Sequence, residues 1–486
     1  MAKQYNNHIS LTNWELVSIN PKKKNWTSKT FFNLWANSIQ TVVGFSLIAS
    51  LYVSYGLNGN VVFIGTMLAG ILATLFANFS GIPCQKMGIP FPVFLRLSLG
   101  IYGAKYGSLL RGLAAISMFG IQTFFISKSL SFLIRIFIFS IDKNLLQNEI
   151  INKFFLGLGL IDWLGLILAS LLQYFLFTRG IKLIKAIINF SGIVVYLAIF
   201  ILALFVFLKN QTNLINSFVA IFDYKKTINL DNLLPILTIT GTMFAYFSIM
   251  LLNFGDYSRY AQNKNELKKG NLSLLINIIL FSFLAVIITI GSDILFHQNL
   301  ISPEKVLTNP TDIIGQFDQI TLSVFGLILI LISTISTNLI VNFIPSNNVL
   351  TNFFPSKTSI KINGIIISLI GFVIGSFWIS FISRVGLLSV IDTIAAFLGP
   401  LFGIIIVDYY FIKKQIIIPK DLFSSDPSGK YYYSNGWCLK SFYSLFIAFI
   451  FSASTIWNTE LRFLNPFSFI IGAFIAGYLQ YLLSEK

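Results

Sequence analysis

The segment LISTISTNLIVNF (residues 331–343) is apolar enough to lie within a lipid bilayer, yet it carries six side chains that are able to form hydrogen bonds. These are Ser333, Thr334, Ser336, Thr337, Asn338 and Asn342. Hydrocarbon offers no water to a polar group, so each buried one needs a partner inside the protein. Ser and Thr can donate to a carbonyl of their own helix. The Asn amide has more donors and acceptors than a helix backbone satisfies. The segment therefore predicts a polar interior within a membrane bundle.

The whole chain has the composition of an integral membrane protein. Of its 486 residues, 55% are hydrophobic and only 11% are charged, against roughly 25% charged in soluble domains. A spanning helix needs about 20 mostly apolar residues. We predict a membrane helix at each of twelve apolar runs: 31–55, 58–80, 107–135, 154–177, 181–208, 232–256, 271–296, 319–344, 361–381, 386–412, 440–457 and 464–484. The more polar segments are predicted as connecting loops with short surface helices: 136–152, 209–231 and 297–318.

The net charge of +16 does not indicate nucleic-acid binding, because basic residues beside apolar spans set membrane topology and contact anionic lipid. With the N-terminus in the cytoplasm, most Lys and Arg residues fall on the cytoplasmic side, although Lys225 and Lys226 fall on the other. This bias predicts a multi-pass protein of the cell membrane with both termini cytoplasmic. We expect lipid as a partner, and no obligate protein partner.

Polar or small residues interrupt two of the apolar runs. ANSIQ (36–40) lies in the first, and Gly241, Asn253 and Gly255 lie in the sixth. Transporters with inverted repeats have broken helices at corresponding places in their two halves. The first and sixth helices correspond if each repeat holds five helices. Gly and Asn are also common in ordinary membrane helices, so both interpretations stay open on this evidence.

Four carboxamides lie in the middle of predicted spans: Gln40, Gln122, Asn338 and Asn342. Each must face another helix, water or a ligand, because one helix backbone cannot satisfy its donors and acceptor. Bonding between helices is the ordinary use of such a residue. Four of them on three different runs favour a ligand cavity.

Four acidic residues lie near membrane depth: Asp162, Asp256, Asp392 and Asp408. Asp256 and Arg259 are one turn apart, so we predict that they pair in a structural or gating role. A proton relay through Asp392 is a further possibility for an acid at this depth. The two cysteines, Cys84 and Cys438, lack metal-binding spacing. No cluster of His, Asp or Cys is visible in the sequence, so we predict no catalytic residue, no enzyme activity and no resident cofactor.

Four segments, in order along the chain, resemble the nucleobase:cation symporter-1 family. They are GIPFPVFLRLSLGIYGAKYGSLLRGLAAISMFGIQTFF (88–125), LNFGDYSRYAQN (252–263), STNLIVN (336–342) and GPLFGIIIVDYYFIKK (399–414). Members of this family carry cytosine and purines, uracil, allantoin, thiamine or hydantoins. The resemblance runs from about residue 30 to about residue 415.

This resemblance implies an all-α, leucine-transporter-like fold with about twelve transmembrane helices. Residues 1–29 would form a cytoplasmic tail. Two inverted repeats of five helices would occupy residues 30–208 and 209–415, and two further helices would lie within residues 416–486.

In the sodium-coupled members of the family, the first and eighth helices hold the ion. Matching the motifs implies carbonyl ligands from Ala36, Ile39 and Ser333, and hydroxyl ligands from Ser336 and Thr337. Such oxygens can replace the water shell of Na⁺ without a carboxylate. We therefore expect sodium as the coupling ion, with the proton as the alternative.

For the substrate, the family pattern points to the same four carboxamides: Gln40, Gln122, Asn338 and Asn342. A carboxamide can match the N–H and C=O edge of a nucleobase or hydantoin, and a flat ring stacks on aromatic faces. The family usually has Trp at the two stacking positions that Met118 and Phe247 occupy here. This departure leaves the identity of the heterocycle open.

The sequence therefore predicts sodium-coupled import, by alternating access, of a small planar heterocycle of the nucleobase, allantoin or hydantoin class. The first alternative is a proton-coupled nucleobase or vitamin permease of the same family. The second is an amino-acid or amine transporter of the same fold.

Overall fold

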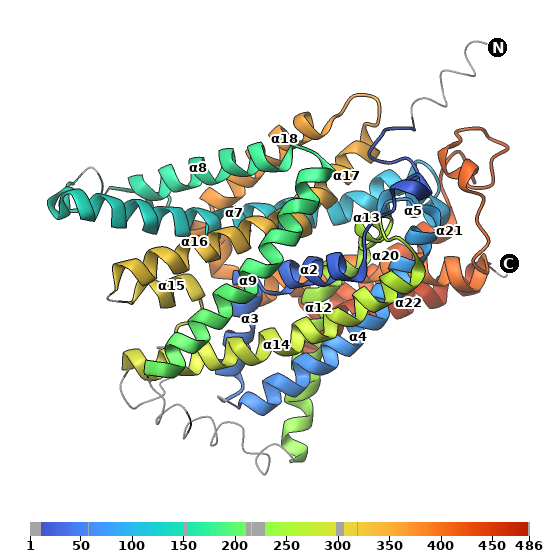
Figure 1. The fold of residues 1–486 in the computed structure, drawn as a ribbon. Helices are drawn as coiled ribbons and strands as arrows, with labels where there is room; N and C mark the ends of the chain where they lie inside the picture. Colours follow the sequence, from blue (N-terminus) through green and yellow to red (C-terminus); the bar gives the residue numbers. More distant parts are fainter. Residues whose placement is uncertain are drawn as a thin grey trace.

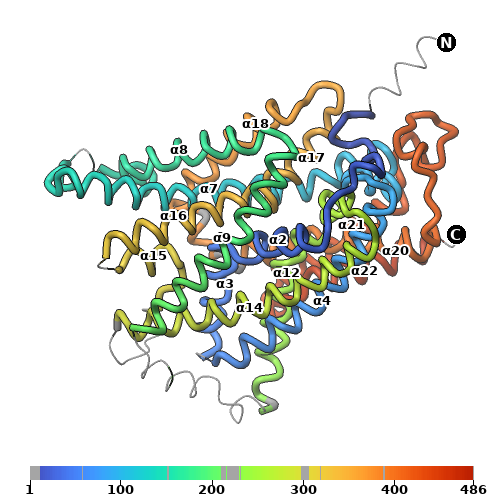
Figure 2. Tube along the Cα trace, viewed as in Figure 1, coloured from blue at the N-terminus to red at the C-terminus, as the bar shows by residue number. Residues whose placement is uncertain are grey.

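The computed structural model describes residues 11–56, 58–149, 151, 153–209, 215, 229–297, 306–317 and 319–484. In this part of the chain, ten helices are long and apolar enough to cross a membrane, and two bent helix pairs raise the number to twelve. The helices form one bundle (Figures 1 and 2). The first described residues and the last turn of α22 (Ser468–Ser484) lie at the same end of it, which we name the terminal end; the opposite end is the distal end.

The first half of the chain supplies a broken helix and four long ones. Its helices are α2 (Ser28–Ile39), α3 (Val42–Ser54), α4 (Gly59–Met87), α5 (Phe91–Phe94), α6 (Arg96–Leu99), α7 (Gly103–Ile141), α8 (Leu160–Phe177) and α9 (Ile181–Lys209). Its minor elements are the 3-10 helices η1 (Pro21–Lys23) and η2 (Lys143–Gln147) and an antiparallel pair of strands, β1 (Phe154–Phe155) and β2 (Leu158–Gly159). In the predicted loop 136–152, η2 is one of the expected short helices, although α7 extends to Ile141.

The second half repeats the pattern of long helices with short interruptions. Its elements are η3 (Leu230–Asn232), α12 (Leu233–Leu252), α13 (Gly255–Ser258), α14 (Lys264–His297), α15 (Pro310–Gly315), α16 (Ile320–Thr337), η5 (Asn338–Phe343), α17 (Ile344–Phe353), α18 (Ile360–Ser376), η6 (Trp378–Ile382), α19 (Ser383–Val385), α20 (Leu387–Val407) and η7 (Asp408–Ile412). After these come η8 (Pro419–Phe423), α21 (Leu439–Trp457), η9 (Thr459–Phe467) and α22. The predicted loop 209–231 lies largely outside the described residues; in the loop 297–318, residues 298–305 and 318 lie outside them, and α15 is one of the expected short helices.

The first membrane helix is broken at the motif ANSIQ. The axes of α2 and α3 bend by 57° where the chain passes through Gln40 and Thr41. Thr41 caps α3, because its Oγ1 accepts a hydrogen bond from the Gly44 N–H at 2.7 Å. A helix end leaves backbone groups without helical partners. The break therefore places polar backbone inside the bundle.

The predicted interruption at Gly241 is wrong. The helix α12 runs through Gly241 and ends only at Leu252, with Asn253 as its C-cap. Gly241 instead permits close packing, since a Cβ there would lie 2.7 Å from the Pro466 carbonyl oxygen of η9. The sixth helix therefore breaks at Asn253, before the short helix α13.

The eighth helix contains a π-helical segment that the sequence analysis did not predict. This segment, η5, joins α16 to α17 without a break in direction. Pro345 follows at the start of α17 and has no N–H, so one carbonyl of the preceding turn lacks its helical donor. In that turn, the Ile340 carbonyl accepts from Tyr257 Oη, and the Val341 carbonyl accepts from Arg111 Nη2 at 2.8 Å. The irregular turn thus binds the sixth and third membrane helices.

The helices α20 and α22 pack closely at Gly403, where a Cβ would overlap the Ala473 carbonyl oxygen. We expect Gly403→Val to lower the free energy of unfolding by about 3 kcal/mol, because the helix backbones must separate. The measurement is thermal unfolding of the detergent-purified protein. As a control, Gly315→Ala should leave the unfolding temperature unchanged, since no atom lies closer than 3.6 Å to its Cβ. Equal unfolding temperatures for Gly403→Val and wild type would contradict this account of the packing.

Candidate substrate and ion site

Three hydroxyl groups of α16 meet α2 beside the helix break. Ser333 Oγ donates to the Gln40 carbonyl at 3.0 Å, and Thr337 Oγ1 donates to the Asn37 carbonyl at 2.6 Å. Ser336 Oγ donates to the side-chain Oδ1 of Asn37 at 2.7 Å. Residues three and four apart share one helix face. That face of α16 therefore presents all three hydroxyls to α2.

The carbonyl groups predicted to bind sodium lie at the same junction. The Ala36 and Ile39 carbonyls belong to the last turn of α2 and accept from the N–H groups of Gln40 and Thr41, at 3.0 and 2.9 Å. The Ser333 carbonyl accepts from Ser336 Oγ at 2.8 Å. The junction is thus rich in uncharged oxygen atoms, which are ligands that suit a hard monovalent cation.

Asn37 belongs to this junction, although the sequence analysis did not single it out. Its Nδ2 donates to the carbonyls of Asn33 and Ile188, at 2.6 and 2.9 Å, and this fixes the direction of its Oδ1. The amide oxygen therefore points to Ser336 and adds one more uncharged oxygen atom to the junction. The sequence could have identified Asn37, because it is a carboxamide inside the quoted motif ANSIQ.

A buried cavity of about 470 Å³ lies next to the junction. Ile39 and Thr337 belong to its lining. Five membrane helices contribute to the walls, namely α2, α7, α12, α14 and the η5 region of the eighth helix. Four of the six predicted substrate residues line it: Met118, Gln122, Phe247 and Asn342.

Two hydrogen-bond acceptors in this cavity are buried and unsatisfied. Within the described part of the chain, neither Gln122 Oε1 nor Asn342 Oδ1 has a hydrogen-bond partner. Asn342 Nδ2 donates to Asn338 Oδ1 at 2.8 Å, which leaves the Asn342 oxygen as its free atom. An unpaired buried acceptor costs about 1–3 kcal/mol. The pair therefore indicates a ligand that brings N–H groups.

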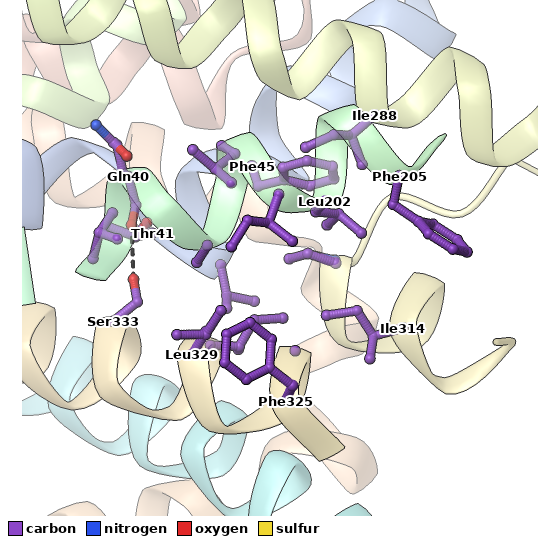
Figure 3. Close-up of a pocket in the computed structure, with 18 of the residues that line it drawn as sticks. Gln40, Thr41, Phe45, Leu202, Phe205, Ile288, Ile314, Phe325, Leu329 and Ser333 are labelled. Atoms are coloured by element: carbon purple, nitrogen blue, oxygen red, sulfur yellow. Dashed lines mark hydrogen bonds between the residues drawn. The ribbon is translucent and has the colours of Figure 1, made fainter. Parts of the chain in front are cut away.

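The structure places Asn338 and Gln40 outside the lining of this cavity. Asn338 Nδ2 donates to the Phe119 carbonyl at 3.1 Å and to Gln173 Oε1 at 2.5 Å, so it joins η5 to α7 and α8. Gln40 lies at the helix break, where its carbonyl meets Ser333 and its side chain points away from the neighbouring apolar residues (Figure 3). Asn338 is joined to the cavity through its Oδ1, which accepts from Nδ2 of the lining residue Asn342 at 2.8 Å.

Aromatic walls come partly from residues that the sequence analysis did not identify. Trp35 lines the cavity, and its indole is fixed by stacking on Phe254 with centroids 4.9 Å apart and by a 3.3 Å bond from Nε1 to Asn271 Oδ1. Tyr246 also lines it and bonds Thr41 Oγ1 at 2.9 Å. Fixed aromatic faces suit a planar ring.

Arg111 connects three membrane helices on the terminal side of the cavity. Its Nε donates to Asn253 Oδ1 at 2.8 Å, and its Nη2 donates to the Val341 carbonyl. One buried guanidinium of α7 therefore binds both the break of the sixth helix and the π segment of the eighth. The sequence analysis did not single out Arg111, although a charged residue inside an apolar run, here within the segment 88–125, indicates a buried polar contact.

Asp256 and Arg259 do not form the expected direct pair. Asp256 accepts from the Phe91 N–H at 3.0 Å and from Asn253 Nδ2 at 3.2 Å. Arg259 instead donates to the Glu15 carbonyl at 2.7 Å and stacks over Tyr260. The two residues therefore bind different partners: Asp256 binds the first residue of α5, and Arg259 binds the N-terminal segment.

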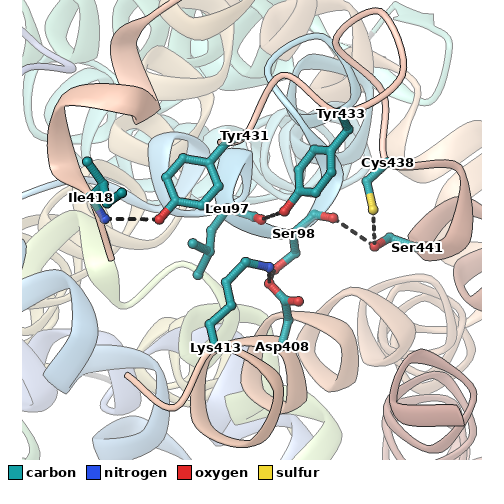
Figure 4. A network of polar contacts seen from close by, with 9 residues as sticks. All are labelled: Leu97, Ser98, Asp408, Lys413, Ile418, Tyr431, Tyr433, Cys438 and Ser441. Atoms are coloured by element: carbon teal, nitrogen blue, oxygen red, sulfur yellow. Dashed lines mark hydrogen bonds and ion pairs between the residues drawn. The ribbon is translucent and has the colours of Figure 1, made fainter. Parts of the chain in front are cut away.

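A second polar network ties the linker after η7 to the terminal end (Figure 4). Asp408 forms a 2.5 Å ion pair with Lys413 and accepts from Ser98 Oγ at 2.8 Å. Tyr433 Oη donates to the Leu97 carbonyl at 2.6 Å. Burial raises the pKa of Tyr433 well above its usual range, so the phenol keeps the proton that it donates. These contacts hold α6, η7 and the linker together.

The comparison with known families agrees with this geometry. The family model described as a permease for cytosine/purines, uracil, thiamine and allantoin matches residues 18–484. The chain belongs to this permease family. The resemblance drawn from four segments is thereby confirmed. Among the relatives of this permease is the allantoin permease of Bacillus subtilis (strain 168), at 25% identity over 99% of this chain and 94% of the relative.

Solved structures show the fold of this permease. Mhp1, a nucleobase-cation-symport-1 family transporter in a closed conformation with bromovinylhydantoin bound, is 18% identical, with a TM-score of 0.73 over 97% of this chain and 94% of that one. A Na⁺-coupled sialic acid symporter is 13% identical, with a TM-score of 0.64 over 96% and 91%. The predicted all-α, leucine-transporter-like membrane fold is confirmed. This protein is a multi-pass permease of the nucleobase and allantoin type.

Proposed function

We propose that this permease imports a small, planar, uncharged heterocycle bearing N–H groups, of the nucleobase, allantoin or hydantoin class, by sodium-coupled symport. The observation that carries the proposal is the pair of unsatisfied acceptors, Gln122 Oε1 and Asn342 Oδ1, in one buried cavity. The described lining of that cavity contains no Asp, Glu, Lys or Arg. A charged amino acid or amine would lack a countercharge there, which disfavours the second alternative.

Thr337 supports the coupling of ion and substrate. It lines the cavity and also donates to the Asn37 carbonyl of α2. A cation bound at the junction would hold the end of α2 against α16 and so complete one wall of the cavity. Coupling requires that each ligand binds one conformation better than the other. The shared wall provides this dependence, and the closed, substrate-bound neighbour Mhp1 has the same fold.

Both termini are proposed to be cytoplasmic. The terminal end carries a basic N-terminal segment and a basic linker, for which Lys22, Lys23, Lys413 and Lys414 are representative. Basic residues beside spans favour the cytoplasmic side. Import then proceeds from the distal end to the terminal end, without chemical change to the substrate.

Uptake into proteoliposomes tests the proposal. The permease is reconstituted and offered radiolabelled cytosine, uracil, allantoin or a hydantoin under an inward sodium gradient, an inward proton gradient, or neither. We expect uptake of one of these classes, stimulated by sodium and saturable. Uptake driven by protons and indifferent to sodium would reject the sodium part. Uptake of none of them would reject the substrate class.

Proton coupling through Asp392 is the second candidate. Asp392 is 7% exposed in α20, and its Oδ2 accepts only a 3.3 Å bond from Asn465 Nδ2. Its Oδ1 has no partner among the described residues. A carboxyl in such a place can exchange a proton.

Replacement of Asp392 by asparagine separates the two candidates. Under sodium coupling, we expect Asp392→Asn to keep sodium-driven uptake near the wild-type level, because its amide can still bond to Asn465. Loss of uptake in Asp392→Asn, together with proton-driven uptake in the wild type, would favour the second candidate. The measurement is initial uptake rate against external pH for both proteins.

A further inference from the structure

A second cavity, of about 720 Å³, is shown from close by in Figure 3, and the helices that line it lie toward the distal end in Figure 1. Its walls come from α3, α9, α14, α15 and α16, and nearly all of its lining side chains are hydrocarbon or aromatic. The polar exceptions lie at the inner end: Gln40, Thr41 and Ser333. The Ser333 hydroxyl is already bonded to the Gln40 carbonyl, whereas the Gln40 carboxamide has no hydrogen-bond partner among the described residues. Beyond this inner end, the walls suit an apolar occupant.

One side of this cavity, named the mouth here, is marked by Phe205 and Phe325 of the lining (Figure 3). Phe325 is 46% exposed and belongs to a helix that is long and apolar enough to cross a membrane, so exposed side chains there would contact lipid. An empty apolar space loses the dispersion contacts that its walls could make. A lipid tail can enter without any change of solvent, because bilayer hydrocarbon is as apolar as the walls. An acyl chain is thus the occupant that costs least.

A positive charge lies near the mouth. Lys209, at the end of α9, is exposed, and its Nζ lies 5.9 Å from the ring centroid of Phe205, which lines the cavity. A lysine at the edge of the membrane attracts a headgroup of net negative charge by direct Coulomb interaction. We propose that the cavity binds one acyl chain of an anionic phospholipid, with Lys209 attracting the net negative charge of its headgroup.

This lipid site shares a wall with the proposed ion junction. The proposed acyl chain would pack against Thr41 and Phe45 of the broken first helix and against Ser333 of α16. Lipid binding at this site does not depend on the identity of the transported substrate. The lipid proposal can therefore be rejected or supported separately from the proposed function.

Photolabelling tests the site in the full-length protein. The probe is phosphatidylglycerol with a diazirine near the end of one acyl chain, in phosphatidylcholine vesicles, and labelled peptides are mapped by mass spectrometry. We expect labels on the cavity-lining residues of α9 and α16. Ala198→Phe fills the cavity and should lower that labelling about tenfold. Ala198→Leu, a smaller filler, should lower it less and serves if the first variant does not fold.

Two comparisons decide the details. Leu197→Phe adds the same ring on the exposed face of α9, where Leu197 is 52% exposed, and should leave labelling unchanged. Lys209→Gln should lower labelling by the phosphatidylglycerol probe about fivefold, but not labelling by the matching phosphatidylcholine probe. Labelling that is unaffected by either Ala198 variant would overturn the cavity as the site. Equal loss with both headgroups, or none, would overturn the role of Lys209.

Discussion

Replacing Gln122 with leucine should weaken substrate binding roughly 10- to 100-fold while the permease still folds and inserts. Leucine keeps much of the side-chain volume but removes Oε1, which is the acceptor that the cavity leaves free. A substrate N–H brought to this point then loses its water without gaining a partner. The measurement is equilibrium binding of the radiolabelled substrate identified by uptake. Asn342→Ala should have an effect of the same order, because it removes the second free acceptor.

The matched control for this prediction is Gln480→Leu. Gln480 is also a buried glutamine, 4% exposed, and its Oε1 also lacks a partner among the described residues. It lies on α22, outside the lining of the 470 Å³ cavity. Substrate affinity should therefore stay at the wild-type value in this variant. If Gln122→Leu and Asn342→Ala both bind substrate as tightly as wild type, the cavity is not the substrate site.

Thr337→Val should raise the sodium concentration for half-maximal stimulation of uptake at least about tenfold. Valine has nearly the same shape as threonine, so the change isolates the hydroxyl. In the structure that hydroxyl contacts the Asn37 carbonyl at 2.6 Å, at the junction of α16 with α2. The measurement is uptake against sodium concentration at saturating substrate, with sodium replaced by choline to keep ionic strength constant.

A neighbouring threonine gives the control. Thr334 is also buried on α16, but its Oγ1 donates to the Ile330 carbonyl of its own helix at 2.8 Å. Thr334→Val should leave the sodium dependence unchanged. An unchanged sodium dependence in Thr337→Val, or an equal loss in both valine variants, would count against an ion site at this junction.

The two predictions report on different atoms of one site. Gln122 lies on α7 and faces only the cavity, whereas Thr337 belongs both to the cavity and to the α2 junction. Gln122→Leu should therefore change substrate affinity and leave the sodium response of the remaining binding intact. Thr337→Val should change both, because the wall that it shares with α2 is incomplete without the ion.

Much of the candidate site could be predicted from residue types. A carboxamide in an apolar span must find partners beyond its own helix, so Gln122 and Asn342 were identifiable before any fold was known. The roles of Asn338 and Gln40 were not. Whether an amide faces a cavity depends on helix rotation, and the π segment and the break at residue 40 alter that rotation locally.

The partners of Arg111 were also beyond prediction from the sequence. The sequence marks it as a costly charge within an apolar run. Its partners, Asn253 and the Val341 carbonyl, are separated from it by 142 and 230 positions along the chain. No local pattern connects residues so far apart. The expected pairing of Asp256 with Arg259 failed for a related reason, since Phe91 binds Asp256 and Glu15 binds Arg259 from positions far away in the sequence.

The sequence by itself determined that this chain spans a membrane repeatedly, because hydrocarbon accepts only long apolar helices whose backbone groups bond to one another. Its motifs also determined the family. The tertiary structure alone decided which polar atoms remain unpaired at the centre. Hydrogen bonds are local in space and not in sequence, so only the packed helices leave Gln122 Oε1 and Asn342 Oδ1 free for a ligand while Asn338 is fully engaged.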